Sequence, residues 1–370
     1  MSATSASMDP APPRERAGPR PRRAARSVLT LLALLLIAVA LVALGHGAYR
    51  IAPVDVLRIL ADGLPGIDVE VDAQQAAVLT AIRAPRVLLA VLTGAGLAVA
   101  GALMQGLFRN PLADPSLIGV SAGAALAAAV VIVLGAVLAP GVVTSGSWAA
   151  AFALPLAAFA GSLAVTALVY RIGHAQGVLS LPITLLAGIA VNAMAMAGVG
   201  LLTYVASDEQ LRTLTFWNLG SLAGGNWTAL AVVGPLVIVA LAAAALLAQP
   251  LNALAMGEAR AGHLGVDVAR TKRKVVVFAA LATGALVAVT GVIGFIGLVA
   301  PHLVRLLCGP DHRVVLPGAA LLGAVLVLLA DLAARTVVVP AELPIGILTA
   351  ALGAPFFLAL LLRRRAAGGL

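Results

Sequence analysis

The sequence predicts an all-α membrane protein that crosses the bilayer many times. Of its 370 residues, 62% are hydrophobic and only 11% are charged, and the mean hydropathy is +1.08. A soluble domain of ordinary composition does not reach these values. Because a bilayer core of about 30 Å needs roughly 20 mostly apolar residues per helix, most of the chain is expected to lie in lipid.

Eight apolar runs are close to the length of a membrane-spanning helix. They cover residues 28–44, 87–108, 117–138, 148–170, 183–205, 230–248, 314–329 and 345–362. Residues 1–26, before the first run, are rich in Pro, Ser, Ala and Arg without an apolar period, which predicts a disordered cytosolic tail. Residues 27–365 are expected to form one transmembrane domain. Within it, residues 93–106 alternate small and large side chains, which favours close helix contacts in lipid.

One further stretch decides whether the number of helices is odd or even. Between Lys274 and Arg305 the chain has no charged residue, and this is too long for one untilted helix but suits two short ones that turn at the glycines of residues 291–297. Two helices put the basic residues around Lys274 and Arg305 on the same side, as the positive-inside rule favours. The prediction is therefore ten helices with both termini in the cytoplasm.

The charges support this topology. With ten helices, most of the 24 basic residues fall on the inner side, and six fall outside: Arg50, Arg58, Arg83, Arg86, Arg212 and Arg335. The net charge of +9 is then an orientation signal and does not indicate a nucleic-acid partner.

The motifs of energy coupling are missing from the sequence. It contains no GxxxxGK[ST] loop for a nucleotide and no HExxH motif, and its five histidines are too scattered for a metal site that the sequence could reveal. Ionisable residues inside the spans are scarce, apart from Asp331, which can pair with Arg335 four residues later. If the protein does work, another chain supplies the energy. A secondary transporter, a membrane enzyme and a receptor remain the alternative classes.

A polar island at residues 250–274 interrupts the apolar pattern. It contains a predicted short helix at residues 251–263, closed by Gly262 and Gly265, on the cytosolic side. Such a helix is suited to fit into a cleft of a soluble partner. The alternative is an amphipathic helix that lies in the membrane interface.

The segment GEARAGHLG within this island resembles the coupling-helix signature of ABC importer permeases. Four more blocks resemble the iron-chelate, haem and cobalamin branch, the FecCD-type permeases, in the same order and spacing: residues 82–124, 291–306, 309–335 and 342–364. The resemblance covers about residues 28 to 365. It implies the type II ABC importer permease fold, with ten helices per subunit and coupling helices at about residues 250–270.

The resemblance also implies partners. They are a second copy of the chain, two ABC ATPase subunits that bind ATP and Mg, and a periplasmic substrate-binding protein, all at the bacterial inner membrane. This chain is then expected to bind no cofactor, to hold no metal and to be no enzyme. The residues implied for ATPase coupling are Leu254, Gly257, Glu258, Ala259, Arg260, Gly262, His263, Leu264 and Gly265.

Three further sets of residues follow from the same resemblance. Docking of the binding protein is expected at Arg83, Arg86 and Arg335, since a guanidinium binds carboxylates in bidentate fashion. The cytoplasmic gate is expected at Asn110, Pro111, Leu112, Ser180, Leu181 and Pro182. The substrate path is expected to include Phe216, Trp217, Met104 and Met194.

The expected cargo is haem. The stretch TFWNLGSL within residues 207–227 resembles the haem-importer branch more than the others, and Phe216, Trp217 and Trp227 suit a flat apolar molecule. Aromatic residues are also common at membrane interfaces, so ferric siderophores and cobalamin remain the alternatives.

Overall fold

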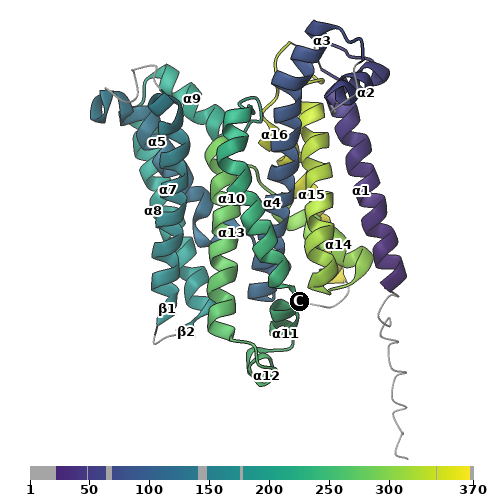
Figure 1. Cartoon of the computed structure of the whole chain (residues 1–370). Coiled ribbons are helices and arrows are strands. Elements are labelled where there is room, and N and C mark those ends of the chain that lie inside the picture. Colours follow the sequence, from purple (N-terminus) through teal and green to yellow (C-terminus); the bar gives the residue numbers. More distant parts are fainter. Residues whose placement is uncertain are drawn as a thin grey trace, which may run out of the picture.

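The protein is a bundle of long helices with short elements at both ends (Figure 1). The computed structural model describes residues 22–47, 49–63, 69–140, 148–175, 178–338 and 340–366. Within this part, eight helices are long and apolar enough to cross a membrane. Two further helices are apolar over shorter segments, Ile296–Cys308 and Ile345–Ala359, and together these agree with the ten helices predicted. The eight are α1 (Arg22–Gly45), α4 (Ala84–Phe108), α5 (Val120–Leu138), α7 (Trp148–Gly173), α8 (Leu181–Val205), α10 (Trp227–Leu246), α13 (Val268–Thr290) and α15 (His312–Ala334), and the two are α14 (Ile296–Cys308) and α16 (Ile345–Ala366).

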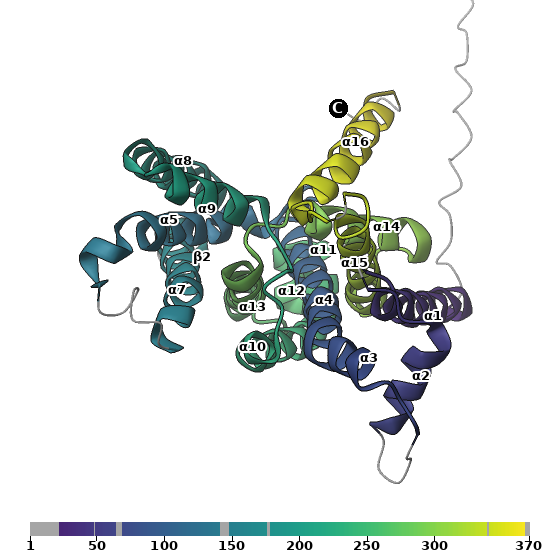
Figure 2. The ribbon, with the colours of Figure 1, turned by 90° about the horizontal axis from the view of Figure 1, so that it is seen from above.

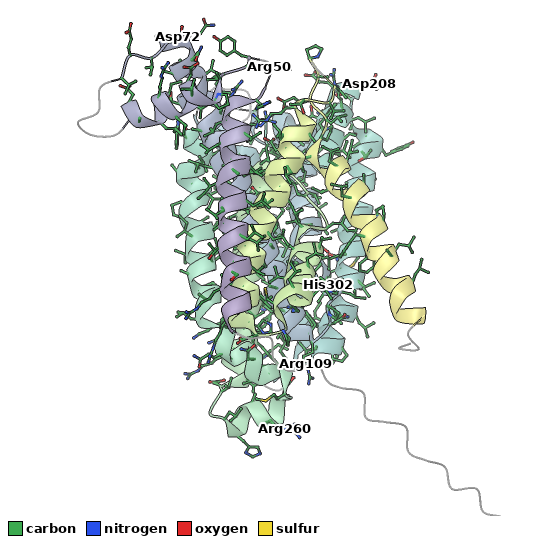
Figure 3. All side chains as sticks on the ribbon, turned by 90° about the vertical axis from the view of Figure 1, so that its right-hand side faces the viewer. Arg50, Asp72, Arg109, Asp208, Arg260 and His302 are labelled. Carbon is green, nitrogen blue, oxygen red and sulfur yellow. The ribbon has the colours of Figure 1, made fainter. Side chains whose placement is uncertain are left out.

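The short elements separate into two groups. Arg50, Asp72 and Asp208 lie at one end of the bundle and Arg109 and Arg260 at the other (Figure 3); following the predicted charges, we call these the outer end and the inner end. The outer elements are α2 (Pro53–Asp62), α3 (Ala73–Ala77), the π-helix η1 (Val78–Arg83) and α9 (Asp208–Leu219). The inner elements are the strand pair β1 (His174–Ala175) and β2 (Val178–Leu179), α11 (Ala248–Ala255) and α12 (Glu258–His263), and the 3-10 helix η2 (Pro115–Ile118) follows the inner end of α4.

Helix α4 is the centre of the bundle. It packs against α10, α13, α14 and α15, and Figure 2 shows it between the group of α5, α7 and α8 and the group of α1, α14 and α15. Two contacts require glycine: a Cβ on Gly94 would lie 2.2 Å from the carbonyl oxygen of Gly323, and one on Gly101 would lie 1.9 Å from that of Gly297. The close packing predicted for residues 93–106 is confirmed.

The predicted break between α13 and α14 is also confirmed. α13 ends at Thr290, α14 begins at Ile296, and the connecting segment bends at Gly291 and Phe295, which both have φ of 67°. Glycine adopts such angles readily, whereas Phe295 is one of two residues other than glycine with a positive φ among the described residues. The segment after α9 contributes a hydrogen bond to the backbone at this break, because the N–H of Ser221 donates to the carbonyl of Thr290 over 2.7 Å.

Two predicted boundaries were wrong. Helix α1 begins at Arg22, so residues 22–26 belong to it, while the rest of the predicted tail lies outside the described residues. The helix predicted at 251–263 is two helices, since Gly257 has φ of 108° and separates α11 from α12. Helix α13 already begins at Val268. Its first turns therefore contain the basic residues Arg270, Lys272, Arg273 and Lys274.

Candidate functional site

The outer end carries the three arginines predicted for docking. Arg83 ends η1 and is 5% exposed. Its guanidinium donates to the carbonyls of Leu44, Gly45 and Tyr49, which lie at and just beyond the end of α1. The last carbonyls of a helix lack partners inside it, so Arg83 supplies the donors that cap α1.

Arg86 lies near the start of α4 and binds two carboxylates. It donates to Asp331 over 2.9 and 3.0 Å and to both oxygens of Glu342 over 2.9 Å each. Asp331 is 1% exposed, whereas the Glu342 side chain is 40% exposed. Arg86 therefore has one buried partner and one partner that solvent can reach.

Arg335 completes this cluster. It is 7% exposed, donates to the carbonyl of Ala43 over 2.8 Å and lies 3.4 Å from the second oxygen of Asp331. The predicted pair of Asp331 and Arg335 along one helix is confirmed. The end of α1 holds Arg83 and Arg335, and Asp331 also pairs with Arg335. Docking of a binding protein at the three arginines stays a prediction.

Sequence reasoning missed Glu342 as the partner of Arg86. The two residues are far apart in sequence, and only the fold brings them together. Of the other outer arginines, Arg50 and Arg212 are exposed, and the guanidinium of Arg212 lies 5.8 Å from the ring centre of Phe216. These exposed cations are further candidates for contact with a partner at the outer end.

At the inner end, α12 projects beyond the rest of the bundle (Figure 1). Glycines with positive φ frame it, Gly257 at 108° and Gly265 at 80°. Of the predicted coupling residues, only Leu254 is buried; Gly257 and Glu258 are half-buried, and the other six are exposed: Ala259, Arg260, Gly262, His263, Leu264 and Gly265. The segment thus presents a continuous exposed surface, in which Leu264 is 62% exposed.

The base of this projection is anchored by an ion pair and by the hydrogen bonds of Asn252. Glu258 forms an ion pair of 2.7 Å with Lys272 of α13. On the other side, Asn252 of α11 donates to Asp311 over 2.6 Å and accepts from the backbone of His312 over 2.9 Å. Partial burial opposes ionisation of Asp311, but donors from Arg313 and Asn252 and the nearby positive charge outweigh it and lower its pKa.

The first predicted gate segment follows α4. Arg109 ends that helix in the left-handed conformation, with φ of 49°, and the side chain of Asn110 accepts from the N–H of Leu112 over 2.9 Å. Pro111 and Leu112 then line a small crevice together with residues of α14 and α16. In the same loop, burial raises the pKa of Asp114 even though its carboxylate caps η2 at Ser116, a feature that sequence reasoning missed.

The second predicted gate segment opens α8. Ser180 precedes this helix, and Leu181 and Pro182 form its first residues. The two segments meet through the helices that follow them, because the amide of Asn192 in α8 donates to the carbonyl of Ser116 in η2 over 2.9 Å. A gating role of either segment stays a prediction.

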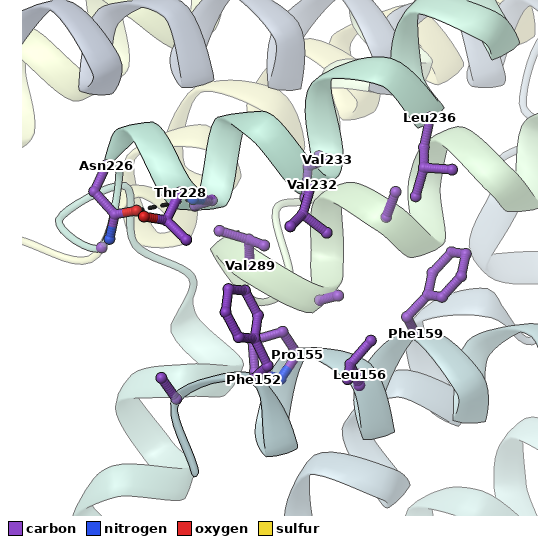
Figure 4. Close-up of a pocket in the computed structure, with 15 residues that line it drawn as sticks. Phe152, Pro155, Leu156, Phe159, Asn226, Thr228, Val232, Val233, Leu236 and Val289 are labelled. Atoms are coloured by element: carbon purple, nitrogen blue, oxygen red, sulfur yellow. Dashed lines mark hydrogen bonds between the residues drawn. The ribbon is translucent and has the colours of Figure 1, made fainter. Parts of the chain in front are cut away.

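The residues predicted for the substrate path do not form one site. Met194 and Phe216 are 62% and 50% exposed, and Trp217 is half-buried, but Met104 is fully buried in the core. Close packing around α4 encloses Met104 in this conformation, and its place in the substrate path stays a prediction. A cavity of about 500 Å³ between α7, α10 and α13 is lined by other residues, mostly apolar, among them Phe152, Leu156, Val232 and Val289 (Figure 4).

Comparisons with known proteins agree with this architecture. The chain is 49% identical over 287 residues to the hemin transport system permease protein of Yersinia pestis, covering 77% of this chain and 83% of that protein. It is 40% identical over 347 residues to the vitamin B12 import system permease protein of Salmonella typhimurium, covering 92% and 96%. A solved structure of a metal-chelate type ABC transporter in an inward-facing conformation matches with a TM-score of 0.78 and 33% identity, covering 91% of this chain and 99% of that one.

The model of the FecCD transport family matches residues 34–363, a range that includes all ten apolar helices except the first part of α1 and the end of α16. With the fold and the relatives in agreement, this membrane protein belongs to the FecCD transport family.

Proposed function

We propose that this chain is the translocation subunit of an ATP-driven importer that carries haem across the bacterial inner membrane by alternating access. The observation that supports haem as the cargo is the 49% identity to a permease named for hemin transport. Cobalamin is the second candidate, because the relative named for vitamin B12 import aligns over a larger share of this chain.

The assembly that we propose contains two copies of the chain, two ATPase subunits and a binding protein. Figure 2 shows α8 and α16 extending on the same side of the molecule, and both expose large apolar residues, including Leu186 at 67%, Leu201 at 66% and Leu352 at 71%. A second copy would cover these faces, and the cargo would pass between the two copies. ATP and Mg would bind to the ATPase subunits and not to this chain.

The orientation that we propose places the inner end in the cytoplasm. It is supported by α1 beginning and α16 ending on the side of α12 (Figure 1) and by the basic residues that gather there. The exposed surface of α12 would then fit into the ATPase, and the outer end with Arg86 and Glu342 would face the binding protein.

The cargo is tested by reconstituting the chain with its ATPase and binding protein in liposomes. We expect ATP-dependent uptake of hemin that excess cyanocobalamin does not reduce, because the binding site for a flat apolar ring should reject a bulkier corrinoid. ATP-dependent uptake of cyanocobalamin without uptake of hemin would contradict the proposal for haem and leave the importer class intact.

A further inference from the structure

Lys272 is a buried lysine at the inner end of the bundle. It lies in the first turns of α13 and is 3% exposed, whereas its neighbours Arg273 and Lys274 are exposed. Lysine is almost never fully buried unless its charge is paired. Its location therefore calls for an explanation beyond the positive-inside rule, which Arg273 and Lys274 already satisfy.

Two contacts hold the ammonium group. Nζ lies 2.7 Å from Oε2 of Glu258 and donates to the carbonyl of Leu179 over 3.1 Å. The carboxylate of Glu258 compensates the positive charge of Lys272, and the carbonyl of Leu179 accepts a hydrogen bond from the same ammonium group. Only the lysine of this pair is buried, since the Glu258 side chain is 39% exposed. Separation of the pair is opposed because it leaves the buried ammonium without its counter-charge.

The two contacts belong to segments that the predictions assigned to different tasks. Glu258 is the first residue of α12, the projection that is expected to meet the ATPase. Leu179 ends β2 and is followed directly by Ser180, where the second gate segment begins. Figure 1 shows β1, β2 and α12 at the same end of the molecule, and Lys272 links them through one atom.

The strand pair passes this connection on to two membrane-spanning helices. β1 follows α7 directly and pairs with β2 in antiparallel register, and the N–H of Ser180 donates to the carbonyl of Gly173 at the end of α7 over 2.9 Å. A displacement of β2 therefore moves the end of α7 and the start of α8 together.

We propose that Lys272 is a positioning residue that transmits the movement of α12 to the strand pair and so to the start of α8. When the ATPase subunits displace α12, Glu258 draws Lys272, and the carbonyl of Leu179 follows. This inference rests on the proposed function, and it adds the specific contact by which hydrolysis at a partner would reach the gate.

The transport test uses the complete importer in liposomes with hemin as cargo. It compares the unaltered protein with Lys272→Met, Lys272→Arg and the control Lys274→Met, an exposed lysine one half-turn further along the same helix. The ratio of ATP hydrolysed to hemin taken up is measured, together with the amount of ATPase that copurifies. Coupling between two sites of a protein typically corresponds to a factor of about 5 to 150. If Lys272 carries this coupling, the ratio of ATP hydrolysed to hemin taken up should rise at least about fivefold in Lys272→Met.

Rescue distinguishes a positioning role from a structural one. Lys272→Arg keeps the charge and can reach both acceptors, and it should return the ratio close to that of the unaltered protein, as should Lys274→Met. An unchanged ratio in Lys272→Met would overturn the proposal. A further variant, Lys272→Gln, guards against an effect of the apolar Met side chain. Loss of copurifying ATPase in both Lys272→Met and Lys272→Gln would also overturn the proposal, because Lys272 would then only hold the fold together.

A second measurement needs no cargo. Spin labels at Ala259 and His174, both exposed, are placed in a Cys308→Ser background, and their separation is recorded with and without ATP. The separation should stay constant when Lys272 is present and change on ATP addition in Lys272→Met. If the separation of the labels responds to ATP in the same way in both proteins, the proposed role of Lys272 is overturned. A failure of hemin uptake by the unaltered protein would instead contradict the proposed cargo.

Discussion

Arg86 binds a buried carboxylate, Asp331, and an exposed one, Glu342, and the two have different consequences. Asp331 also neutralises Arg335, so two guanidinium groups depend on one side chain that is 1% exposed. Asp331 is thus expected to stabilise the fold, whereas Glu342 is the partner of Arg86 that solvent can reach.

Replacing Asp331 with Asn should destabilise the protein. The change leaves two cations with too little negative charge, and breaking a buried pair costs about 3–5 kcal/mol, which should lower the midpoint of thermal unfolding in detergent. The control is Asp55→Asn, which breaks an exposed pair with Arg58 and should cost less than about 1 kcal/mol. Equal midpoints for the two variants would show that the cluster contributes nothing to stability.

Replacing Glu342 with Gln should strengthen docking of the binding protein. The change frees Arg86 for an acidic partner without disturbing Asp331, so the association rate should rise and become more sensitive to salt. Binding kinetics at two ionic strengths measure both quantities, with Glu70→Gln as the control at an exposed outer position. If Glu342→Gln and Glu70→Gln bind alike, Arg86 is not part of the docking surface.

At the scale of single elements, α4 and α12 show opposite requirements for glycine. Gly101 is needed because another backbone occupies the space of a side chain, and Gly257 because its φ of 108° suits glycine alone. The sequence predicts the first through its alternation of small residues. It does not predict the break at Gly257, because a glycine between two helical stretches is also compatible with one continuous helix.

Replacing Gly101 with Ala should reduce the amount of folded protein. The new methyl group would meet the carbonyl oxygen of Gly297 at 1.9 Å, and overpacking of a tight contact costs typically about 1–3 kcal/mol. Gly200→Ala is the matched control, since a Cβ at Gly200 in α8 would meet nothing within 4 Å. Size-exclusion profiles and thermal midpoints compare them, and a stable Gly101→Ala variant would contradict the backbone contact.

Replacing Leu264 with Asp should weaken binding of the ATPase. Leu264 is 62% exposed beside α12, so the change should remove an apolar contact with a partner and leave the thermal midpoint unaltered. Leu57→Asp is the control, because Leu57 is 55% exposed on α2 at the opposite end. Copurification of the ATPase is the measurement. Its retention by Leu264→Asp would exclude this surface as the ATPase contact.

At the scale of the whole molecule, the number and order of the helices follow from hydropathy and charge, which the bilayer imposes on any sequence that crosses it. The positions of Arg83 and Met104 do not follow from them. Arg83 is buried because carbonyls at the distant end of α1 require donors, and Met104 is enclosed because four helices surround α4. Such facts depend on contacts between segments far apart in the chain, which a local pattern cannot contain.

Uptake of hemin by reconstituted liposomes shows whether ATP hydrolysis by a partner drives transport through this protein. We expect uptake to require the partner ATPase and hydrolysable ATP, and to be unchanged by ionophores that dissipate proton and sodium gradients. Uptake that continues without the ATPase and stops when an ionophore is added would exclude an ATP-driven importer and identify the protein as an ion-driven carrier.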